Sequence, residues 1–194
     1  MAKKKGLTFY EKKKKISKAM IREIFSTIFY VFAAVLLAFV IVFSVGMKTS
    51  VIGVSMEPIL ANGQEVLINR FIYSITSPNR GDVIVFLPNG NENSHYYIKR
   101  IVGLPGERVQ IIGGYVYING ELLEEDETYD KIADPGLAET EIVLGSDEYF
   151  VLGDNRNNSE DSRSGNIGAV SRSTIEGKVW FGLPGQEAEM GFVR

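Results

Sequence analysis

The sequence predicts a mainly β domain that follows a single N-terminal transmembrane helix. A run without charged residues extends from Ile24 to Met47, and short β-rich stretches alternate with turn residues over the rest of the 194-residue chain. The chain contains no Cys, which excludes a disulfide scaffold, an iron–sulfur cluster and a Cys-ligated zinc site. Its one histidine, His95, excludes a multi-histidine metal site, and we expect no cofactor or metal.

The apolar run is long enough to cross a membrane. Residues 24–46 contain no Pro, and their only Gly is Gly46 at the far end; about 20 such residues span a bilayer core as a helix. A cleaved signal peptide has a shorter apolar region of about 7–15 residues. The small residues Ser44 and Gly46 leave cleavage open, but a retained anchor is the favoured interpretation.

The charge distribution sets the expected orientation of this helix. Residues 1–23 contain nine Lys or Arg and two Glu, whereas the rest of the chain contains 12 basic and 22 acidic residues. A basic run alone is typical of a solvated arm or of nucleic-acid binding. Lysines before a lone span instead predict a cytoplasmic tail that contacts anionic lipid, with no nucleic acid as partner. Residues 47–194 are therefore expected outside the cytoplasm.

The predicted domain is a sandwich or partly open barrel of antiparallel strands. Gly113-Gly114 and Asn119-Gly120 are typical of tight hairpin turns. The acidic stretch Glu121–Asp130 is interpreted as a solvated loop because it lacks the ligand spacing of a calcium loop. The expected strands are Glu65–Tyr73, Asp82–Leu87, Tyr96–Val102, Arg108–Ile112, Tyr115–Ile118, Tyr149–Leu152 and Lys178–Phe181.

Three stretches carry the residue types that catalysis would need. Ser55 precedes Pro58, which restricts the backbone, although such a segment alone is more often a plain turn. Strand alternation places Lys99 between Tyr97 and Ile101 on one face. A desolvated lysine has a lowered pKa and can act as a general base toward serine, whereas a lysine with its amine in solvent on an edge strand would have no such role.

The third stretch runs from Gly153 to Arg163 and is rich in Asn, Asp and Ser, which hydrogen-bond to nearby backbone. It follows an apolar strand, so it suits the support of a site as well as an ordinary surface loop. His95 is the only candidate for a histidine base, but in its polar surroundings a plain surface residue is favoured.

In this order after one membrane span, these stretches resemble the bacterial type I signal peptidases, in their small Gram-positive form. Each segment alone is weak, but together in register they are specific. The segments are Ser55-Met56-Glu57-Pro58, Arg80-Gly81-Asp82-Val83-Ile84-Val85-Phe86, Tyr97-Ile98-Lys99-Arg100-Ile101-Val102-Gly103-Leu104-Pro105-Gly106-Glu107 and Gly153 through Arg163.

The resemblance implies a role for each matching residue. Ser55 would be the nucleophile, Lys99 the general base, and Ser159 a hydrogen-bond partner that orients the Lys99 amine. Gly53 stands where some members of the family carry a serine whose hydroxyl helps to bind the oxyanion, so the second oxyanion donor is open. Arg100, Asp154, Asp161 and Arg163 would form a supporting polar network, and Met56 and Ile98 would line shallow substrate pockets.

The same resemblance implies a membrane-bound serine endopeptidase, without metal or cofactor, with two antiparallel sheets in its catalytic core. It would remove signal peptides after small-x-small sites from preproteins that emerge from the translocation machinery. The expected location is the bacterial cell membrane, with the catalytic domain outside the cytoplasm. Because Ser55 lies nine residues after Gly46, it would stand at most ~30 Å from the end of the span.

Three alternatives belong to other classes. The first is a membrane-anchored β-rich binding module without catalysis, which would need neither Ser55 nor Lys99 buried. The second is a Ser/Lys protease that cleaves itself or a regulator, although such proteins are soluble and the apolar span argues against one. The third is a hydrolase that uses Ser55 and His95, which replacement of His95 would test.

Overall fold

The computed structural model describes residues 17–45, 47–91, 95–125, 128–185 and 188–193. It divides between Val40 and Ile41 into two compact units, which are described separately. The basic tail expected over residues 1–23 lies mostly outside the described residues, as does Gly46.

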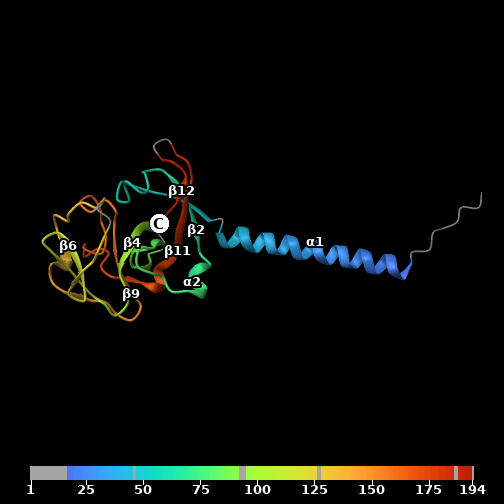
Figure 1. Ribbon diagram of the computed structural model, residues 1–194, viewed down its shortest axis with the longest axis horizontal. Helices are drawn as coiled ribbons and strands as arrows, with labels where there is room; N and C mark the ends of the chain where they lie inside the picture. Colours follow the sequence, from blue (N-terminus) through green and yellow to red (C-terminus); the bar gives the residue numbers. More distant parts are fainter. Residues whose placement is uncertain (1–16, 46, 92–94, 126–127, 186–187, 194) are drawn as a thin grey trace, which may run out of the picture. The chain divides into compact units, whose positions relative to one another are not determined.

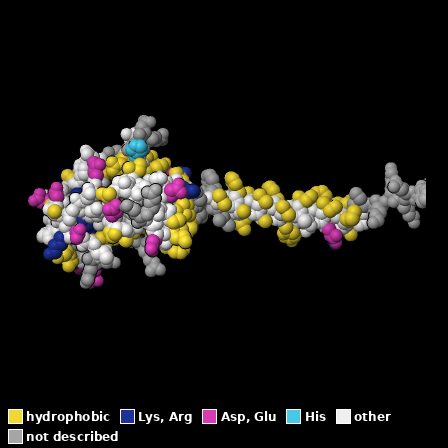
Figure 2. Space-filling model, turned by 90° about the horizontal axis from the view of Figure 1, so that it is seen from above, with side chains coloured by type: hydrophobic (Ala, Val, Ile, Leu, Met, Phe, Trp, Pro, Cys, Tyr) yellow, Lys and Arg dark blue, Asp and Glu magenta, His cyan; other side chains and the backbone are white. Residues whose placement is uncertain are grey.

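The first unit is the N-terminal part of helix α1 (Lys18–Val45). This helix begins earlier than the expected span because Ser17 caps it: the Ser17 Oγ accepts a hydrogen bond from the Met20 N–H at 3.1 Å. Residues Lys18–Val40 are long and apolar enough to cross a membrane, with a mean hydropathy of 2.2. Figure 2 shows hydrophobic side chains along this helix, as expected for a lipid-exposed span.

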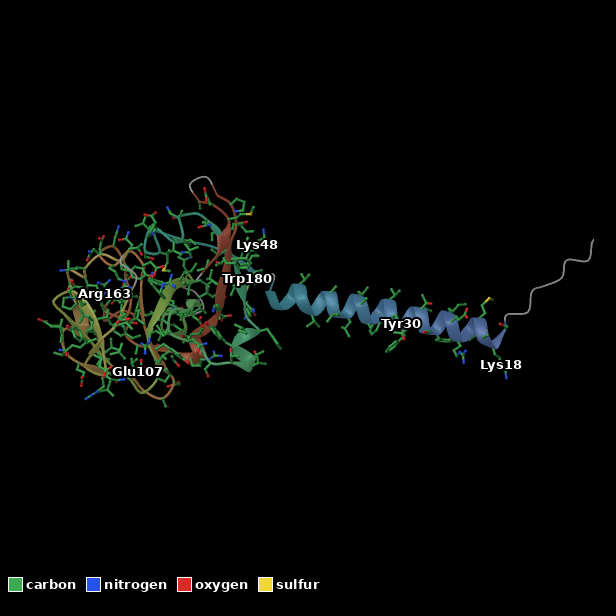
Figure 3. All side chains as sticks on the ribbon, viewed as in Figure 1. Lys18, Tyr30, Lys48, Glu107, Arg163 and Trp180 are labelled. Carbon is green, nitrogen blue, oxygen red and sulfur yellow. The ribbon has the colours of Figure 1, made fainter. Side chains whose placement is uncertain are left out.

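The second unit contains two antiparallel sheets (Figure 1), which confirms the mainly β fold class. The larger sheet has the strand order β1-β2-β11-β3-β4-β9-β10, with β12 also paired to β11. Its strands are β1 (Met47–Ser50), β2 (Glu65–Asn69), β3 (Val83–Phe86), β4 (Tyr97–Gly103), β9 (Glu148–Leu152), β10 (Val170–Ser171), β11 (Ile175–Gly182) and β12 (Gly191–Phe192). Lys48 of β1 and Trp180 of β11 are labelled in Figure 3.

The smaller sheet has the order β7-β6-β5-β8. Its strands are β5 (Arg108–Ile112), β6 (Tyr115–Ile118), β7 (Glu121–Leu122) and β8 (Ile142–Val143). Both predicted hairpin turns are present, and the central residues of each have positive φ, which suits Gly and Asn. The short helices are α2 (Ile72–Ile75) and the 3₁₀ turns η1 (Pro88–Gly90), η2 (Gly136–Glu139) and η3 (Arg172–Thr174).

One predicted strand is too long. The stretch expected as Glu65–Tyr73 leaves the sheet after Asn69, and α2 follows. The cause is local, because the Asn69 Oδ1 accepts hydrogen bonds from the N–H groups of Phe71 and Ile72 at 3.1 and 3.0 Å. An Asn side chain that bonds to the backbone two and three residues later turns the chain out of the extended conformation.

Strand β4 lies at the centre of the packing. Its residues from Ile98 to Gly103 are buried, and three of them belong to three separate apolar clusters. Ile98 packs in one cluster with Met56, Ile101 in another with Phe86, and Val102 in a third that joins the two sheets. A strand buried on both faces holds its side chains in fixed positions, and Lys99 and Arg100 stand on this strand.

Candidate active site

The segment that carries Ser55 is a tight turn between two buried anchors. Val51 and Met56 are both buried, and Ser55 lies between them, half-buried. Gly53 has a φ of +86°, a conformation that side chains other than glycine rarely adopt. Its N–H donates to the Asn62 Oδ1 at 2.9 Å, which fixes the turn before the serine.

Lys99 projects from β4 toward this turn. Its Nζ donates a hydrogen bond to the Ser55 Oγ at 2.7 Å, and the residue is only 4% exposed. Burial lowers the pKa of Lys99 from 10.5 to about 8, against the opposing effect of the nearby carboxylates, of which Asp161 is the strongest. The sequence-based expectation of a desolvated lysine beside Ser55 agrees with this geometry, and a lysine whose amine reaches solvent does not.

The loop from Gly153 to Arg163 packs against the segment that carries Ser55. The Asn155 N–H donates to the Ser55 carbonyl oxygen at 3.0 Å, and the Asn155 Nδ2 donates to the Val54 carbonyl oxygen at 3.2 Å. A Cβ on Gly153 would lie 2.5 Å from the Ser55 carbonyl oxygen and 2.2 Å from the Ser159 Oγ. Glycine is therefore required at this position, because no side chain fits between the loop and Ser55.

The four charged residues implied by the resemblance form two buried ion pairs. Arg100 donates from Nε and Nη2 to the two carboxylate oxygens of Asp154, both at 2.7 Å, and from Nη1 to the Gly81 carbonyl oxygen at 2.7 Å. Arg163, labelled in Figure 3, donates to Asp161 from Nε and Nη2 at 2.8 and 2.9 Å. The Asp161 carboxylate also accepts hydrogen bonds from the Gly153 N–H at 3.1 Å and the Arg163 N–H at 3.2 Å, so this pair holds the start of the loop.

A third arginine, Arg156, supports the same loop, and its role was not predicted. Arg156 is 2% exposed, donates to both Glu125 carboxylate oxygens at 2.8 and 2.7 Å, and stacks over the Tyr129 ring. The acidic stretch predicted as a solvated loop therefore differs in two ways: it begins in strand β7 with the exposed Glu121, and Glu125 is not free in solvent but neutralises a buried cation. Residues 126–127 of this stretch lie outside the described residues.

Ser159 does not make its predicted contact. Its Oγ is buried and has no hydrogen-bond partner among the described residues, while the Lys99 Nζ bonds to Ser55 instead. Ser159 still packs directly against Gly153, at the centre of the site.

A cavity of about 390 Å³ opens in front of the Ser55–Lys99 pair. Met56 and Ile98, the two residues expected at the substrate pockets, both line it. His95 lines it too, but makes no hydrogen bond to Ser55 in the part of the chain that the structure describes. The remaining lining residues are Val51, Ile52, Gly53, Val54, Tyr96, Tyr97, Asn158 and Glu160.

Besides Arg156, sequence reasoning missed two further residues of the site. Asn155 and Glu160 both lie in the Gly153–Arg163 loop, which the sequence singled out as a whole without showing which side chains face the serine. No group of three or more potential metal ligands occurs among the described residues.

Residues 22–183 match the signal peptidase family, peptidase S26. The chain is 38% identical over 130 residues to a probable signal peptidase I-2 from Synechocystis sp., with 65% of this chain and 57% of the relative covered. It is 32% identical over 155 residues to signal peptidase I P from Bacillus subtilis subsp. natto, with 74% and 82% covered. It is 33% identical over 169 residues to signal peptidase IB from Staphylococcus aureus, with 76% and 85% covered.

A crystal structure of a signal peptidase I from Enterococcus faecalis is 32% identical, with 54% of this chain and 98% of that chain covered and a TM-score of 0.44. The family match and the identities to curated relatives show that the chain belongs to the signal peptidase family, peptidase S26. The named signal peptidases I among these relatives support the same enzyme identity for this chain.

Proposed function

We propose that the protein is a membrane-bound serine endopeptidase that cleaves signal peptides from secreted preproteins, with Ser55 as nucleophile and Lys99 as general base. The observation that carries the proposal is the 2.7 Å contact between the Lys99 Nζ and the Ser55 Oγ, made by a lysine that is 4% exposed. A base must lie within hydrogen-bond distance of the proton it removes, and its pKa must lie near the working pH.

Acylation begins when Lys99 is neutral. Its Nζ then accepts the Ser55 hydroxyl proton while the Oγ attacks the carbonyl carbon of the scissile bond. The Lys99 ammonium that results donates its proton to the nitrogen of the leaving chain as the C–N bond breaks. The products of this step are a mature protein with a free amine and an ester between Ser55 and the signal peptide.

Deacylation repeats the same proton transfers with water. Lys99, neutral again, accepts a proton from the water that attacks the ester carbon, and returns it to the Ser55 Oγ as the ester bond breaks. The Ser55 backbone N–H donates no hydrogen bond within the described part of the chain, so it is available to the oxyanion in both steps. With Gly53 lacking a side-chain donor, the second donor must come from another group.

The substrate would lie extended along the cavity between the Val51–Met56 segment and the start of β4. Before Arg100, β4 pairs with β3 on one edge only, because its pairing with β9 begins at Arg100, and the residues of this half-paired stretch line the cavity. Met56 and Ile98 take up the space where substrate side chains would enter. Small side chains near the scissile bond, as in small-x-small sites, suit such pockets.

Helix α1 would anchor the enzyme in the membrane, with the basic N-terminal tail in the cytoplasm and the catalytic domain on the opposite side. Support comes from the apolar segment Lys18–Val40 and from the lysine-rich sequence that precedes it. The cleavage site of a signal peptide lies at the end of its apolar helix, near the membrane surface. An anchored enzyme would therefore be held close to the same membrane surface.

The test is cleavage of an Ala-x-Ala preprotein by the full chain in lipid or detergent. We expect Ser55→Ala and Lys99→Ala to lose cleavage and His95→Ala to keep it. Ser50→Ala and Lys48→Ala are matched controls, because both residues are exposed on β1. Near-wild-type cleavage by Lys99→Ala would refute the mechanism, loss of activity in His95→Ala would favour a histidine base, and an inactive wild type that still binds preproteins would favour a binding module.

A further inference from the structure

The cavity in front of Ser55 carries one carboxylate that the proposed mechanism does not use. Glu160 lines this cavity together with Lys99 and His95. Its two neighbours in the loop have other roles, because Ser159 packs against Gly153 and Asp161 is paired with Arg163. Glu160 itself is exposed and makes no salt bridge with the described residues.

The Glu160 carboxylate is nevertheless held in place. The Tyr97 Oη donates to its Oε2 at 3.2 Å, and the Asn166 Nδ2 donates to its Oε1 at 3.0 Å. Both donors are neutral, so they fix the position of the carboxylate without cancelling its charge. Tyr97 stands two residues before Lys99 on β4, which places the carboxylate beside the path of an extended substrate.

The charge balance of the cavity depends on the state of Lys99. While Lys99 is protonated, its positive charge offsets the negative charge of Glu160. Once Lys99 is neutral, Glu160 is the remaining fixed charge among the described residues that line the cavity. The other carboxylates close to Lys99 are Asp154 and Asp161, which are buried, and each has an arginine as partner. The reactive enzyme thus presents a negative cavity rim.

We infer that Glu160 is a specificity-determining residue that selects preproteins with a Lys or Arg near the scissile bond and disfavours those with Asp or Glu there. The inference rests on the proposed function. A bound substrate displaces water from the cavity, and a charge pair is stronger where water is excluded. A basic substrate side chain would supply the cation that Glu160 lacks, whereas an acidic one would add a second negative charge.

The test compares peptide substrates by competition in one reaction. The set shares an Ala-x-Ala cleavage site, with Lys, Gln or Glu placed in turn at each flanking position other than −1 and −3. Competition reports the ratio of kcat/KM values, so any effect of a Glu160 substitution on the proton affinity of Lys99 cancels. The enzymes are the full-length wild type, Glu160→Gln, Glu160→Lys and, as a matched control, Glu121→Gln.

At low salt we expect the wild type to prefer the Lys peptide over the Gln peptide by about two- to fivefold at the responsive position. In Glu160→Gln this preference for the Lys peptide should fall toward one, and Glu160→Lys should prefer the Glu peptide instead. The wild-type preference should also become smaller at high salt, which screens exposed charges. Glu121 is exposed on β7 of the smaller sheet and outside the cavity, so Glu121→Gln should keep the wild-type ratio.

Equal cleavage of all peptides by the wild type would overturn this inference and leave the proposed function intact. A preference for Lys that persists in Glu160→Gln would also overturn it, because another group would then select the charge. Failure of the wild type to cleave any peptide of the set would overturn the proposed function together with the inference.

Discussion

Replacing Lys99 with Met is expected to abolish cleavage and, at neutral pH, to stabilise the folded protein. The lysine is 4% exposed, and burial is the main cause of its lowered pKa. A group whose charged form is disfavoured by burial makes the folded state less stable whenever it carries that charge. Met has a similar length and no charge, so it fills the same space without this cost.

The size of the effect follows from the pKa of Lys99, which is 10.5 ordinarily and about 8 in the folded protein. At pH 7 this difference corresponds to about 3 kcal/mol of unfolding free energy. Loss of the hydrogen bond to Ser55 removes about 1 kcal/mol of stability at every pH. The net gain for Lys99→Met at pH 7 is therefore about 2 kcal/mol.

The pH dependence gives the prediction its sign. Between pH 8 and 10.5 the unfolded chain holds the Lys99 proton and the folded protein does not, so wild-type stability rises with pH over this window. Above pH 10.5 the unfolded chain has lost this proton too, so the ionisation of Lys99 no longer changes the stability. The advantage of Lys99→Met should therefore be largest below pH 8 and vanish or reverse by about pH 10.5.

The assay is urea unfolding of the full chain in detergent at pH 7 and at high pH, for wild type, Lys99→Met and the exposed control Lys48→Met. Other titrating groups are shared by all three proteins, so they cancel in the differences between them. A stability difference between Lys99→Met and wild type that stays constant across this pH range would refute the reasoning, since it would mean that Lys99 is not forced to bear a buried charge.

Three further predictions concern the same site. The acid limb of the kcat/KM profile should have an apparent pKa of about 8, because only neutral Lys99 can accept the serine proton; a limb below pH 6 would contradict this. Gly153→Ala should cut cleavage at least about tenfold, because the new Cβ would push the loop away from Ser55. Gly177→Ala, at another crowded glycine in β11, should destabilise by about 1–3 kcal/mol without a comparable loss of activity; equal losses of activity would point to a general folding defect. Asp154→Ala should lower the free energy of unfolding by about 3–5 kcal/mol, because it removes the carboxylate that Arg100 contacts. Urea unfolding measures this change, and a value below about 1 kcal/mol would mean that the ion pair has a minor role.

The sequence predicted the strands that alternate in hydrophobicity or end at glycine turns. The hairpin around Gly113-Gly114 is present because two adjacent glycines can both adopt positive φ. The two-residue strands β7, β8, β10 and β12 were not predicted, because pairing with a distant neighbour defines them and two residues carry no period. The end of β2 was predictable in principle, since Asn69 is a residue type that forms such turns.

The sequence predicted which motifs form the site, but not all of the contacts between their side chains. Ser55 and Lys99 lie 44 positions apart, and their 2.7 Å contact depends on how β4 packs against the turn that carries Ser55. The resemblance placed Ser159 beside the lysine amine, but its Oγ has no partner among the described residues, so only its general location agrees. The roles of Arg156 and Glu125 depend on a contact between two loops, and the sequence of neither loop predicts that contact.

The arrangement of charges around Lys99 shows why the site needs its arginines. Burial lowers the pKa of Lys99, while the carboxylates of Asp161, Glu160 and Asp154 act in the opposite direction. Two of these carboxylates are buried, and each is paired with a guanidinium that weakens its field at the lysine. Without those partners, the carboxylates would raise the pKa of Lys99 further and favour its protonated form. Under the proposed mechanism, Arg100 and Arg163 would therefore act indirectly, because they let a loop rich in acidic residues support a lysine that has to lose its proton.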